Sequence, residues 1–300
     1  GAEGVGLFRT EVPFMIKEHF PSEQEQVDCY RTQLQGFAPR PVTMRTLDIG
    51  GDKSLPYFPI VEDNPFLGWR GIRVTLDHPE IFLVQIRAML KASQGLDNLQ
   101  ILLPMITHVS EVDEALILIE QAYRELIEEG CLVKMPPVGV MIEVPAAVYQ
   151  AEHLATKVDF ISVGSNDLTQ YLLAVDRDNP QVADLYHALH PAVLKALQQI
   201  VDAGKAADIP VSLCGELASD PAGALLLMAM GYDTLSMNAA GLPRVKSVIR
   251  NFSLAQAQSM LQQVLLQTSS TQVEALVKEN MEAAGLNRMH SQVVKLKEKS

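Results

Sequence analysis

Short apolar runs rich in β-branched residues alternate with longer segments of helical periodicity along nearly the whole chain. The candidate strands lie near residues 5–9, 42–48, 99–105, 138–143, 159–164, 210–214 and 233–237. This alternation is typical of a parallel sheet with crossover helices, so the predicted fold class is α/β. With 300 residues and 48% hydrophobic content, the chain can bury a sizeable core, which excludes disorder as its default state.

The number of strands and the residues that follow them separate two α/β architectures. Seven strands fit either an open, doubly wound sheet or a (β/α)8 TIM barrel that lacks one strand. Polar residues lie at or just after several strand ends: Arg9, Arg45, Asp48, Glu143, Asn166, Asp167, Cys214 and Glu216. A barrel collects site residues from many strands, whereas an open sheet concentrates them at one switch point. Because the chain also starts at Gly1 without Met, we predict a barrel whose first strand is missing from this chain.

Helix signals divide the chain further. The most distinct helix is expected between Ser110 and Gly130, with a capping box at Ser110 and Asp113 and with Gly130 after the C-cap. The barrel domain is expected over residues 1–252. Residues 253–300 are expected to form C-terminal helices followed by a polar, solvated tail at 295–300.

Charge and cysteine content exclude several classes of protein. The 24 basic and 36 acidic residues give a net charge of −12, and the basic residues are scattered, so nucleic-acid binding is not expected. The three cysteines have no CxxC spacing, which indicates a reducing compartment and a cytoplasmic protein. No apolar run approaches the roughly 18 residues of a membrane span, and the N-terminus has no signal-peptide pattern.

Four arginines are candidates for binding a small polyanion: Arg9, Arg45, Arg70 and Arg177. The planar fork of a guanidinium matches carboxylate and phosphate oxygens. A single arginine is more often part of a surface ion pair, but Arg9 and Arg45 lie in strand-like runs where an unpaired guanidinium would be costly. Gly50 and Gly51 follow one of these strands and fit an anion-binding turn and an ordinary turn equally.

Two carboxylates and a thiol end three further strands. Glu143 ends an apolar strand and Asp167 follows the next one, so we expect both at the same rim. Two carboxylates, with water and substrate oxygens as the other ligands, suit Mg²⁺. The alternative role is capping of the helix that follows. The sequence favours this role more for Asp167 than for Glu143, which Pro145 follows closely. Cys214 ends another strand, and a thiol with a pKa of roughly 8.5 can donate a proton near neutral pH.

Seven motifs together strongly resemble the C-terminal domain of the phosphoenolpyruvate-protein phosphotransferase family, enzyme I of the bacterial phosphotransferase system. They are GVGLFRTE at 4–11, RTLDIGGDK at 45–53, NPFLGWR at 64–70, VMIEVPAA at 140–147, GSNDLTQY at 164–171, AVDR at 174–177 and CGE at 214–216. These motifs occur in the order of the family, and the resemblance extends to about residue 252. The segment LSMNA at 235–239 resembles the nitrogen-related paralogue slightly more than the sugar enzyme.

The resemblance implies a phosphoenolpyruvate- and pyruvate-binding barrel that dimerises and requires Mg²⁺. By position, it assigns substrate binding to Arg9, Arg45, Asn166, Asp167 and Arg177, Mg²⁺ binding to Glu143 and Asp167, and protonation of C3 of the enolate to Cys214. Arg70 would be a further arginine of the pocket. In phosphoryl transfer, such arginines and a divalent ion position the phosphate and neutralise its charge.

The resemblance also implies a route for the phosphoryl group. In the family it passes from phosphoenolpyruvate to a histidine on a separate N-terminal domain and then to a phosphocarrier protein of the HPr type, and pyruvate is released. None of the seven histidines here lies in a Thr-Ser-His context, so this chain alone is expected to bind its substrate without becoming phosphorylated. Two alternatives stay open: a Mg²⁺-dependent lyase or aldolase acting on pyruvate-like substrates, and a phosphoenolpyruvate-sensing dimerisation module.

Overall fold

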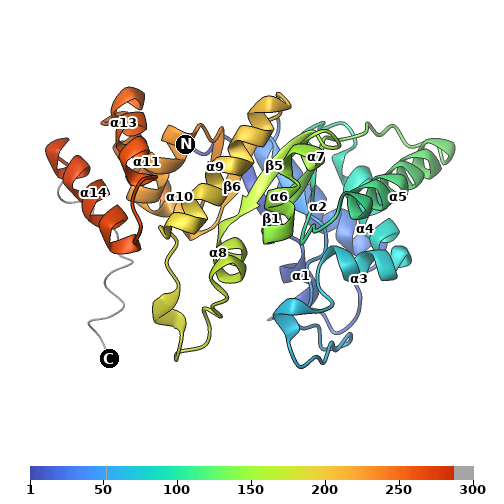
Figure 1. Ribbon diagram of the computed structural model, residues 1–300. Coiled ribbons are helices and arrows are strands. Elements are labelled where there is room, and N and C mark those ends of the chain that lie inside the picture. The colour runs from blue at the N-terminus through green and yellow to red at the C-terminus, as the bar shows by residue number, and fades with distance from the viewer. Residues whose placement is uncertain (52, 287–300) are drawn as a thin grey trace. The chain divides into compact units, whose positions relative to one another are not determined.

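The computed structural model of the chain describes residues 1–51 and 53–286 and contains one parallel sheet (Figure 1). Its strands are β1 (Val5–Arg9), β2 (Val42–Arg45), β3 (Leu99–Leu103), β4 (Val138–Ile142), β5 (Phe160–Gly164), β6 (Val211–Cys214) and β7 (Thr234–Ser236). They follow one another in sequence order, with helices between successive strands. The strand order confirms the predicted α/β class and the β/α repeat of the barrel family. All seven predicted strands are present, although β2 ends at Arg45 rather than near residue 48.

The chain divides into two compact units, which are described separately. The N-terminal unit comprises Glu3–Ile142 and His153–Ser162, and the C-terminal unit comprises Gly1–Ala2, Glu143–Glu152 and Val163 onward. The helices of the N-terminal unit are α1 (Glu11–Met15), α2 (Glu23–Phe37), α3 (Ile72–Asp77), α4 (Pro79–Ser93) and α5 (Val109–Glu128), with a 3-10 turn, η1, at Pro65–Leu67. Those of the C-terminal unit are α6 (Pro145–Tyr149), α8 (Ser165–Leu173), η2 (Ala183–Leu185), α9 (Pro191–Ala206), α10 (Glu216–Ser219), α11 (Pro221–Met230), α12 (Leu242–Arg250), α13 (Leu254–Val264) and α14 (Ser270–Ala283). The short α7 (Ala151–Ala155) contains the boundary between the two units.

In the N-terminal unit, helices cover the buried strands. Every residue of β2 and β4 is buried, and α4 packs between α2 and α5 (Figure 1). The segment between β2 and α3 contributes Leu47, Ile49 and Leu55 to an apolar cluster that also contains Phe14 and Val74. The alternating positions 47 and 49 point their side chains into this cluster, and the residue between them, Asp48, is fully buried as well. Apolar packing therefore fixes the segment that carries this carboxylate.

One helix prediction needs correction. The helix predicted between Ser110 and Gly130 begins at Val109, so the third helical residue is Glu111, whose carboxylate accepts the His108 N–H at 2.8 Å. The predicted box at Ser110 and Asp113 is therefore wrong, because the register starts earlier than expected. Gly130 follows the helix in the left-handed region, with φ 82°, as predicted. The residues that follow β4 form two short helices, α6 and α7, which are separated at Gln150.

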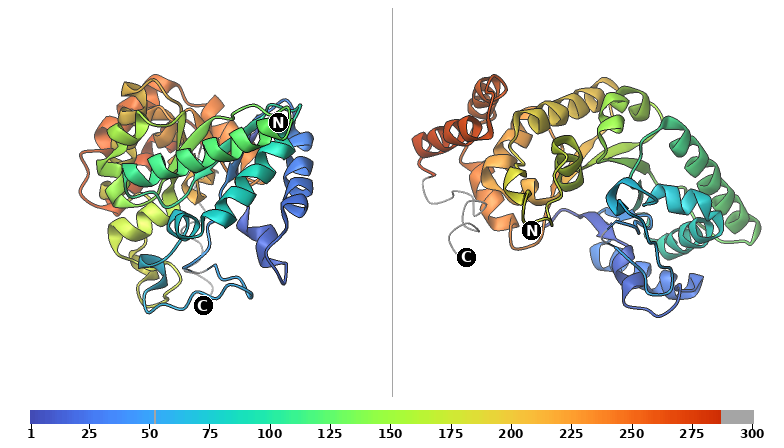
Figure 2. Two further views of the ribbon diagram at one scale, coloured as in Figure 1. Left: turned by 90° about the vertical axis from the view of Figure 1, so that its right-hand side faces the viewer. Right: turned by 60° about the horizontal axis from the view of Figure 1, so that its bottom comes forward.

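In the C-terminal unit, α11 is apolar on nearly all sides and is buried. Asp220 caps its start by accepting the Gly223 N–H at 2.9 Å, and Gly231 ends it with φ 97°. Helix α13 packs against α11, and α14 packs against α13 (Figure 2). The predicted domain boundary after residue 252 stays a prediction, and the polar tail predicted at 295–300 lies outside the described residues. No helix within 1–51 and 53–286 is long and apolar enough to cross a membrane.

Candidate functional site

The structure places the predicted site residues at the carboxyl ends of strands or in the turns that follow them. In the N-terminal unit, Arg9 and Arg45 are the last residues of β1 and β2 and are register partners in these neighbouring strands. In the C-terminal unit, Glu143 directly follows β4, and Cys214 is the last residue of β6. Asn166 and Asp167 lie in the first turn of α8, which begins directly after β5, and Arg177 lies in the loop between α8 and η2. Each set is therefore brought to the strand ends of its own unit, where barrel proteins hold their reactive groups.

A buried charge cluster lies at the strand ends of the N-terminal unit. It contains Glu11, Arg45, Asp48, Lys53 and Arg70. Arg45 Nη2 lies 2.6 Å from Glu11 Oε1 and 3.0 Å from Asp48 Oδ2, and Arg45 Nη1 lies 3.7 Å from the Met141 sulfur. Arg70 Nε lies 3.2 Å from Asp48 Oδ1, and Lys53 Nζ also bonds to Asp48. These contacts fix the orientation of the Arg45 and Arg70 guanidinium groups before any ligand binds.

The charge cluster strongly perturbs Asp48. Burial alone would raise the pKa of this fully buried carboxyl, but attraction to Arg45, Arg70 and Lys53 outweighs burial and holds the pKa well below its ordinary 3.8. Asp48 is therefore ionised throughout the physiological pH range. Its negative charge stabilises three cations that would otherwise repel one another.

Positive charge is in excess around the charge cluster. Its three cations face two carboxylates, and Arg9, on the strand beside Arg45, adds a fourth cation and is exposed. Clustered positive charge of this kind attracts anions. The binding of a small polyanion by these arginines stays a prediction.

The depressed pKa of Asp48 predicts how stability depends on pH. On acidification, the unfolded chain takes up the proton first, so the stability that Asp48 provides above pH about 4 is lost as pH falls. We expect the free energy of unfolding to fall more steeply between about pH 5 and about pH 2 in the wild type than in Asp48→Asn. Urea denaturation across this range measures the slope. The matched control is Asp113→Asn, because Asp113 pairs with Lys157 at an exposed position. Equal slopes in the wild type and Asp48→Asn would contradict the lowered pKa of Asp48.

Gly50 and Gly51 form a closed turn rather than an open anion cradle. Gly50 N–H donates to Lys53 O at 2.9 Å, and Lys53 N–H donates to Gly50 O at 3.1 Å. Gly50 has φ 101°, and a Cβ there would lie 2.5 Å from the Trp69 carbonyl oxygen. The ordinary-turn alternative therefore accounts for Gly50, and the turn places the Lys53 ammonium against Asp48.

In the C-terminal unit, the ends of β5 and β6 are joined by direct hydrogen bonds. Ser165 Oγ donates to Cys214 O at 3.2 Å, and Asn166 Oδ1 accepts the Glu216 N–H at 3.2 Å. Gly215, with φ 130°, allows this approach, because a Cβ there would lie 2.3 Å from Ser165 Oγ. The Cys214 thiol is buried and donates to Val163 O at 3.4 Å. The thiol is thus held beside the helix turn that carries Asn166 and Asp167.

The loop that carries Arg177 is attached to the same helix turn. The backbone N–H of Arg177 donates to Gln170 Oε1 at 3.2 Å, and Tyr186 Oη donates to Asn166 O at 3.3 Å. Burial raises the pKa of Tyr186 to about 12, so its hydroxyl remains a donor. Arg177 Nη1 is buried and has no hydrogen-bond partner among the described residues. Burying a donor of this kind lowers the stability of the fold unless a ligand accepts its hydrogen bond.

Glu143 and Asp167 are the two carboxylates that the sequence predicts as metal ligands. Glu143 is 1% exposed and Asp167 is 8% exposed. Within the described part of the chain, no group of three or more histidine, cysteine or acidic residues is arranged to hold a metal ion. A site with two protein carboxylates leaves most positions to water and substrate oxygens, which is the donor set that Mg²⁺ accepts. The residues present fit Mg²⁺ better than a metal that requires a complete protein cage.

Sequence reasoning missed two contributors to the site. Glu11, the buried partner of Arg45, directly follows the Arg9-Thr10 pair, so its place in the motif was its only signal. Tyr186 lies in a loop without periodicity, and no sequence pattern marks it. Both act through contacts that depend on the tertiary structure.

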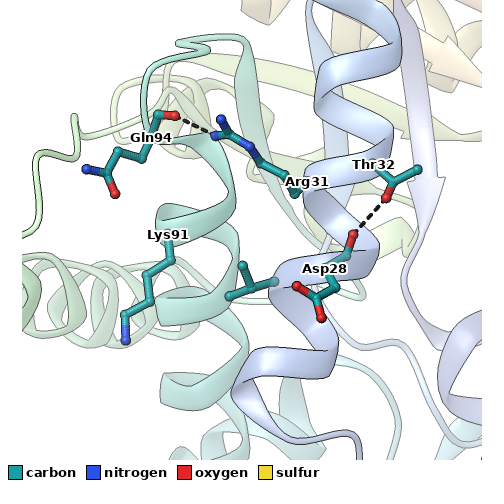
Figure 3. A pocket seen from close by; sticks show the side chains of 6 residues that line it. Asp28, Arg31, Thr32, Lys91 and Gln94 are labelled. Atoms are coloured by element: carbon teal, nitrogen blue, oxygen red, sulfur yellow. Dashed lines mark hydrogen bonds between the residues drawn. The ribbon is translucent and has the colours of Figure 1, made fainter.

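A separate surface pocket of about 640 Å³ lies between α2 and α4 (Figure 3). Its charged side chains are already occupied: Arg31 Nη1 donates to the carbonyls of Ala92, at 2.9 Å, and Gln94, and Lys91 bonds to Glu23. None of the predicted site residues lines it. We therefore assign the pocket no part in the candidate site.

Parallel β/α repeats in sequence order, with arginines, carboxylates and a thiol at the strand ends, define a protein of the barrel class. A family model described as "PEP-utilising enzyme, PEP-binding domain" matches residues 1–254. The chain belongs to this family, as the sequence motifs predicted.

Curated proteins are similar in sequence to nearly the whole chain. A protein of Escherichia coli strain K12 named "Phosphoenolpyruvate-dependent phosphotransferase system" is 52% identical over 285 residues, and its counterpart in Salmonella typhimurium is 51% identical. Each match covers 95% of this chain and 38% of the relative. The "Phosphoenolpyruvate-protein phosphotransferase" of Haemophilus influenzae is 44% identical over 289 residues, 96% of this chain and 50% of the relative. The chain thus spans half or less of the length of these relatives.

Proposed function

We propose that the chain binds phosphoenolpyruvate and serves as the catalytic domain of a phosphoenolpyruvate-protein phosphotransferase. The observation that carries this proposal is the buried Arg177 nitrogen, which lacks a partner within the described residues and belongs to the AVDR motif of the family. The excess of cations at Arg9 and Arg45 adds to it. The family match favours neither a lyase nor a non-enzymatic sensor over the phosphotransferase.

We propose that Arg9, Arg45 and Arg177 bind the phosphate and carboxylate groups of the substrate. Asn166 Oδ1 is occupied by the Glu216 N–H, which leaves its Nδ2 group to donate to the ligand, together with the backbone at Asp167. The Arg45 guanidinium, whose position is already set by Glu11 and Asp48, needs little reorganisation when charge shifts on the phosphate. These residues would hold the phosphorus atom for in-line attack and neutralise its charge.

Glu143 and Asp167 would hold Mg²⁺, with water and substrate oxygens completing its ligands. When bound, Mg²⁺ would supply charge neutralisation at the phosphate. Both carboxylates are buried, and carboxylate oxygens are ligands that Mg²⁺ accepts in proteins.

Cys214 is proposed to protonate the enolate of pyruvate. In this step the S–H bond breaks, a C–H bond forms at C3, and the sulfur is left as a thiolate that water re-protonates. The thiol is buried and held by Val163 O and the Ser165 contact to its backbone, so its position is set by β5 and α8.

The phosphoryl group is proposed to pass to a histidine on an N-terminal domain and then to a phosphocarrier protein of the HPr type. The proposal rests on the names and the greater length of the relatives. We further propose that the protein is a cytoplasmic homodimer. Neither nucleic acid nor a membrane is proposed as a partner.

Calorimetric titration of phosphoenolpyruvate tests the proposed site. We expect binding that strengthens at least about tenfold when Mg²⁺ is present, and we expect Glu143→Ala to abolish that gain, because it removes one of two protein ligands. Glu152→Ala, on the exposed side of α7, is the control and should behave as the wild type. If Glu143→Ala retains the gain, Glu143 does not bind the metal. If the wild type does not bind phosphoenolpyruvate at all, the proposed function is wrong.

A further inference from the structure

Gln85 on α4 is a buried polar residue that no sequence motif contains. Gln85 is 1% exposed, and both its carboxamide oxygen and its NH₂ group are hydrogen-bonded. Oε1 accepts the Leu47 N–H at 2.8 Å, and Nε2 donates to Thr10 Oγ1 and to Tyr30 Oη, both at 3.1 Å. One carboxamide thus joins the segment after β1, the segment after β2 and helix α2.

The orientation of the carboxamide is determined by its neighbours. Thr10 Oγ1 donates its own hydrogen to Arg45 O at 2.7 Å, and Tyr30 Oη donates to Gln26 Oε1 at 3.0 Å. Both hydroxyl oxygens can therefore only accept from Gln85, which directs its NH₂ group toward them and its oxygen toward Leu47. Gln26 in turn donates to Pro21 O at 2.9 Å, which continues the network to the start of α2.

The network reaches the backbone beside Arg9 and at Arg45. Thr10 directly follows Arg9 and bonds to the carbonyl of Arg45, while Leu47 directly precedes Asp48, the carboxylate that holds Arg45. A shift of the carboxamide would therefore move the backbone that carries both guanidinium groups. Small displacements of such groups weaken binding because the ligand requires several hydrogen bonds at once.

We propose that Gln85 is a positioning residue for phosphoenolpyruvate: its carboxamide fixes Arg9 and Arg45, through Thr10 and Leu47, in the geometry that binds the substrate. This inference rests on the proposed function, because it takes phosphoenolpyruvate as the ligand. Gln85 itself does not contact the ligand in this proposal. It acts from behind the strand ends, through backbone groups.

The test compares two buried carboxamides of the N-terminal unit. Gln85→Leu removes the network at the carboxyl ends of the strands. Asn98→Leu removes two hydrogen bonds, to Leu34 O at 3.0 Å and to Arg40 O at 2.8 Å, just before β3 begins. By calorimetry with Mg²⁺, we expect Gln85→Leu to weaken phosphoenolpyruvate binding roughly 10- to 100-fold, and Asn98→Leu to weaken it less than about twofold. Thermal unfolding of both variants measures the loss of stability, which both should share.

A second pair of variants tests the route through Thr10 and replaces Gln85→Leu if that variant does not fold. Thr10→Val removes the hydroxyl and should weaken binding, whereas Thr10→Ser keeps it and should restore the wild-type affinity. The losses of Thr10→Val and Gln85→Leu should be less than additive when combined, since both break one network. Faster amide hydrogen exchange at Leu47 in Gln85→Leu would show the released segment without any ligand.

The outcomes separate this inference from the proposed function. If the wild type binds phosphoenolpyruvate and Gln85→Leu and Thr10→Val bind it equally well, Gln85 has no positioning role. If Gln85→Leu and Asn98→Leu lose affinity to the same extent, the effect is general destabilisation and the inference is wrong. A wild type without phosphoenolpyruvate binding overturns the proposed function, and the positioning role with it, even if Leu47 exchange responds as expected.

Discussion

Arg45→Ala is expected to abolish measurable phosphoenolpyruvate binding and to lower the free energy of unfolding by about 3–5 kcal/mol. The loss of stability follows from the contacts at 2.6 Å to Glu11 and 3.0 Å to Asp48, both almost fully buried. Removing the guanidinium leaves these carboxylates next to each other with only Lys53 and Arg70 to compensate them. Urea denaturation and calorimetric titration measure the two effects.

Arg177→Ala is the matched comparison for Arg45→Ala. Its Nη1 has no partner among the described residues, so its removal leaves no buried acid uncompensated. We expect it to weaken binding about 100-fold or more with little change in stability, because a charged hydrogen-bonding group contributes about 1.5–3 kcal/mol per bond. A stable Arg45→Ala with wild-type affinity would show that the charge cluster has no role in binding. Equal loss of stability in both variants would contradict the distinction between a paired and an unpaired arginine.

Cys214→Ala is expected to slow proton exchange at C3 of pyruvate by roughly 10²- to 10⁴-fold while leaving phosphoenolpyruvate affinity within about twofold. The reverse of the proposed step takes a proton from C3 to the thiolate, so deuterium enters pyruvate in heavy water. Proton NMR follows this exchange in the presence of Mg²⁺ and inorganic phosphate. The assay needs no phosphoryl acceptor, and it therefore reports on the chain by itself.

Cys29→Ala is the control for Cys214→Ala. Cys29 is half-buried on α2, where burial raises the pKa of its thiol, and α2 carries none of the candidate site residues. Its replacement should leave exchange unchanged. Exchange at the wild-type rate in Cys214→Ala would remove the thiol from the mechanism. A loss of phosphoenolpyruvate affinity as large as the loss of exchange would instead indicate a binding role.

The periodicity of the sequence predicted all seven strands but not every helix. Helix α2 was missed although Ser22 and Glu25 form a capping box, with the Ser22 N–H donating to Glu25 Oε2 at 2.9 Å. The buried face of α2 consists of Gln26, Tyr30 and Leu34, so two of its three buried residues are polar or amphipathic. An apolar stripe, the usual signal of a packed helix, is therefore weak there. The polar residues are buried because the hydrogen-bond network of Gln85 satisfies them.

The sequence by itself determined the order of strands, the α/β class and the polar residues at the strand ends. Side chains of a strand alternate and polar residues follow apolar runs, so these properties are local and visible along the chain. Only the tertiary structure decided that Arg45 pairs with Glu11, that three cations surround Asp48 and that Gln85 joins two strand ends. The contacts of Arg45 with Glu11, of Arg70 with Asp48 and of Gln85 with Thr10 join residues far apart in sequence. All of the contacts depend on strand register and burial, which no local pattern encodes.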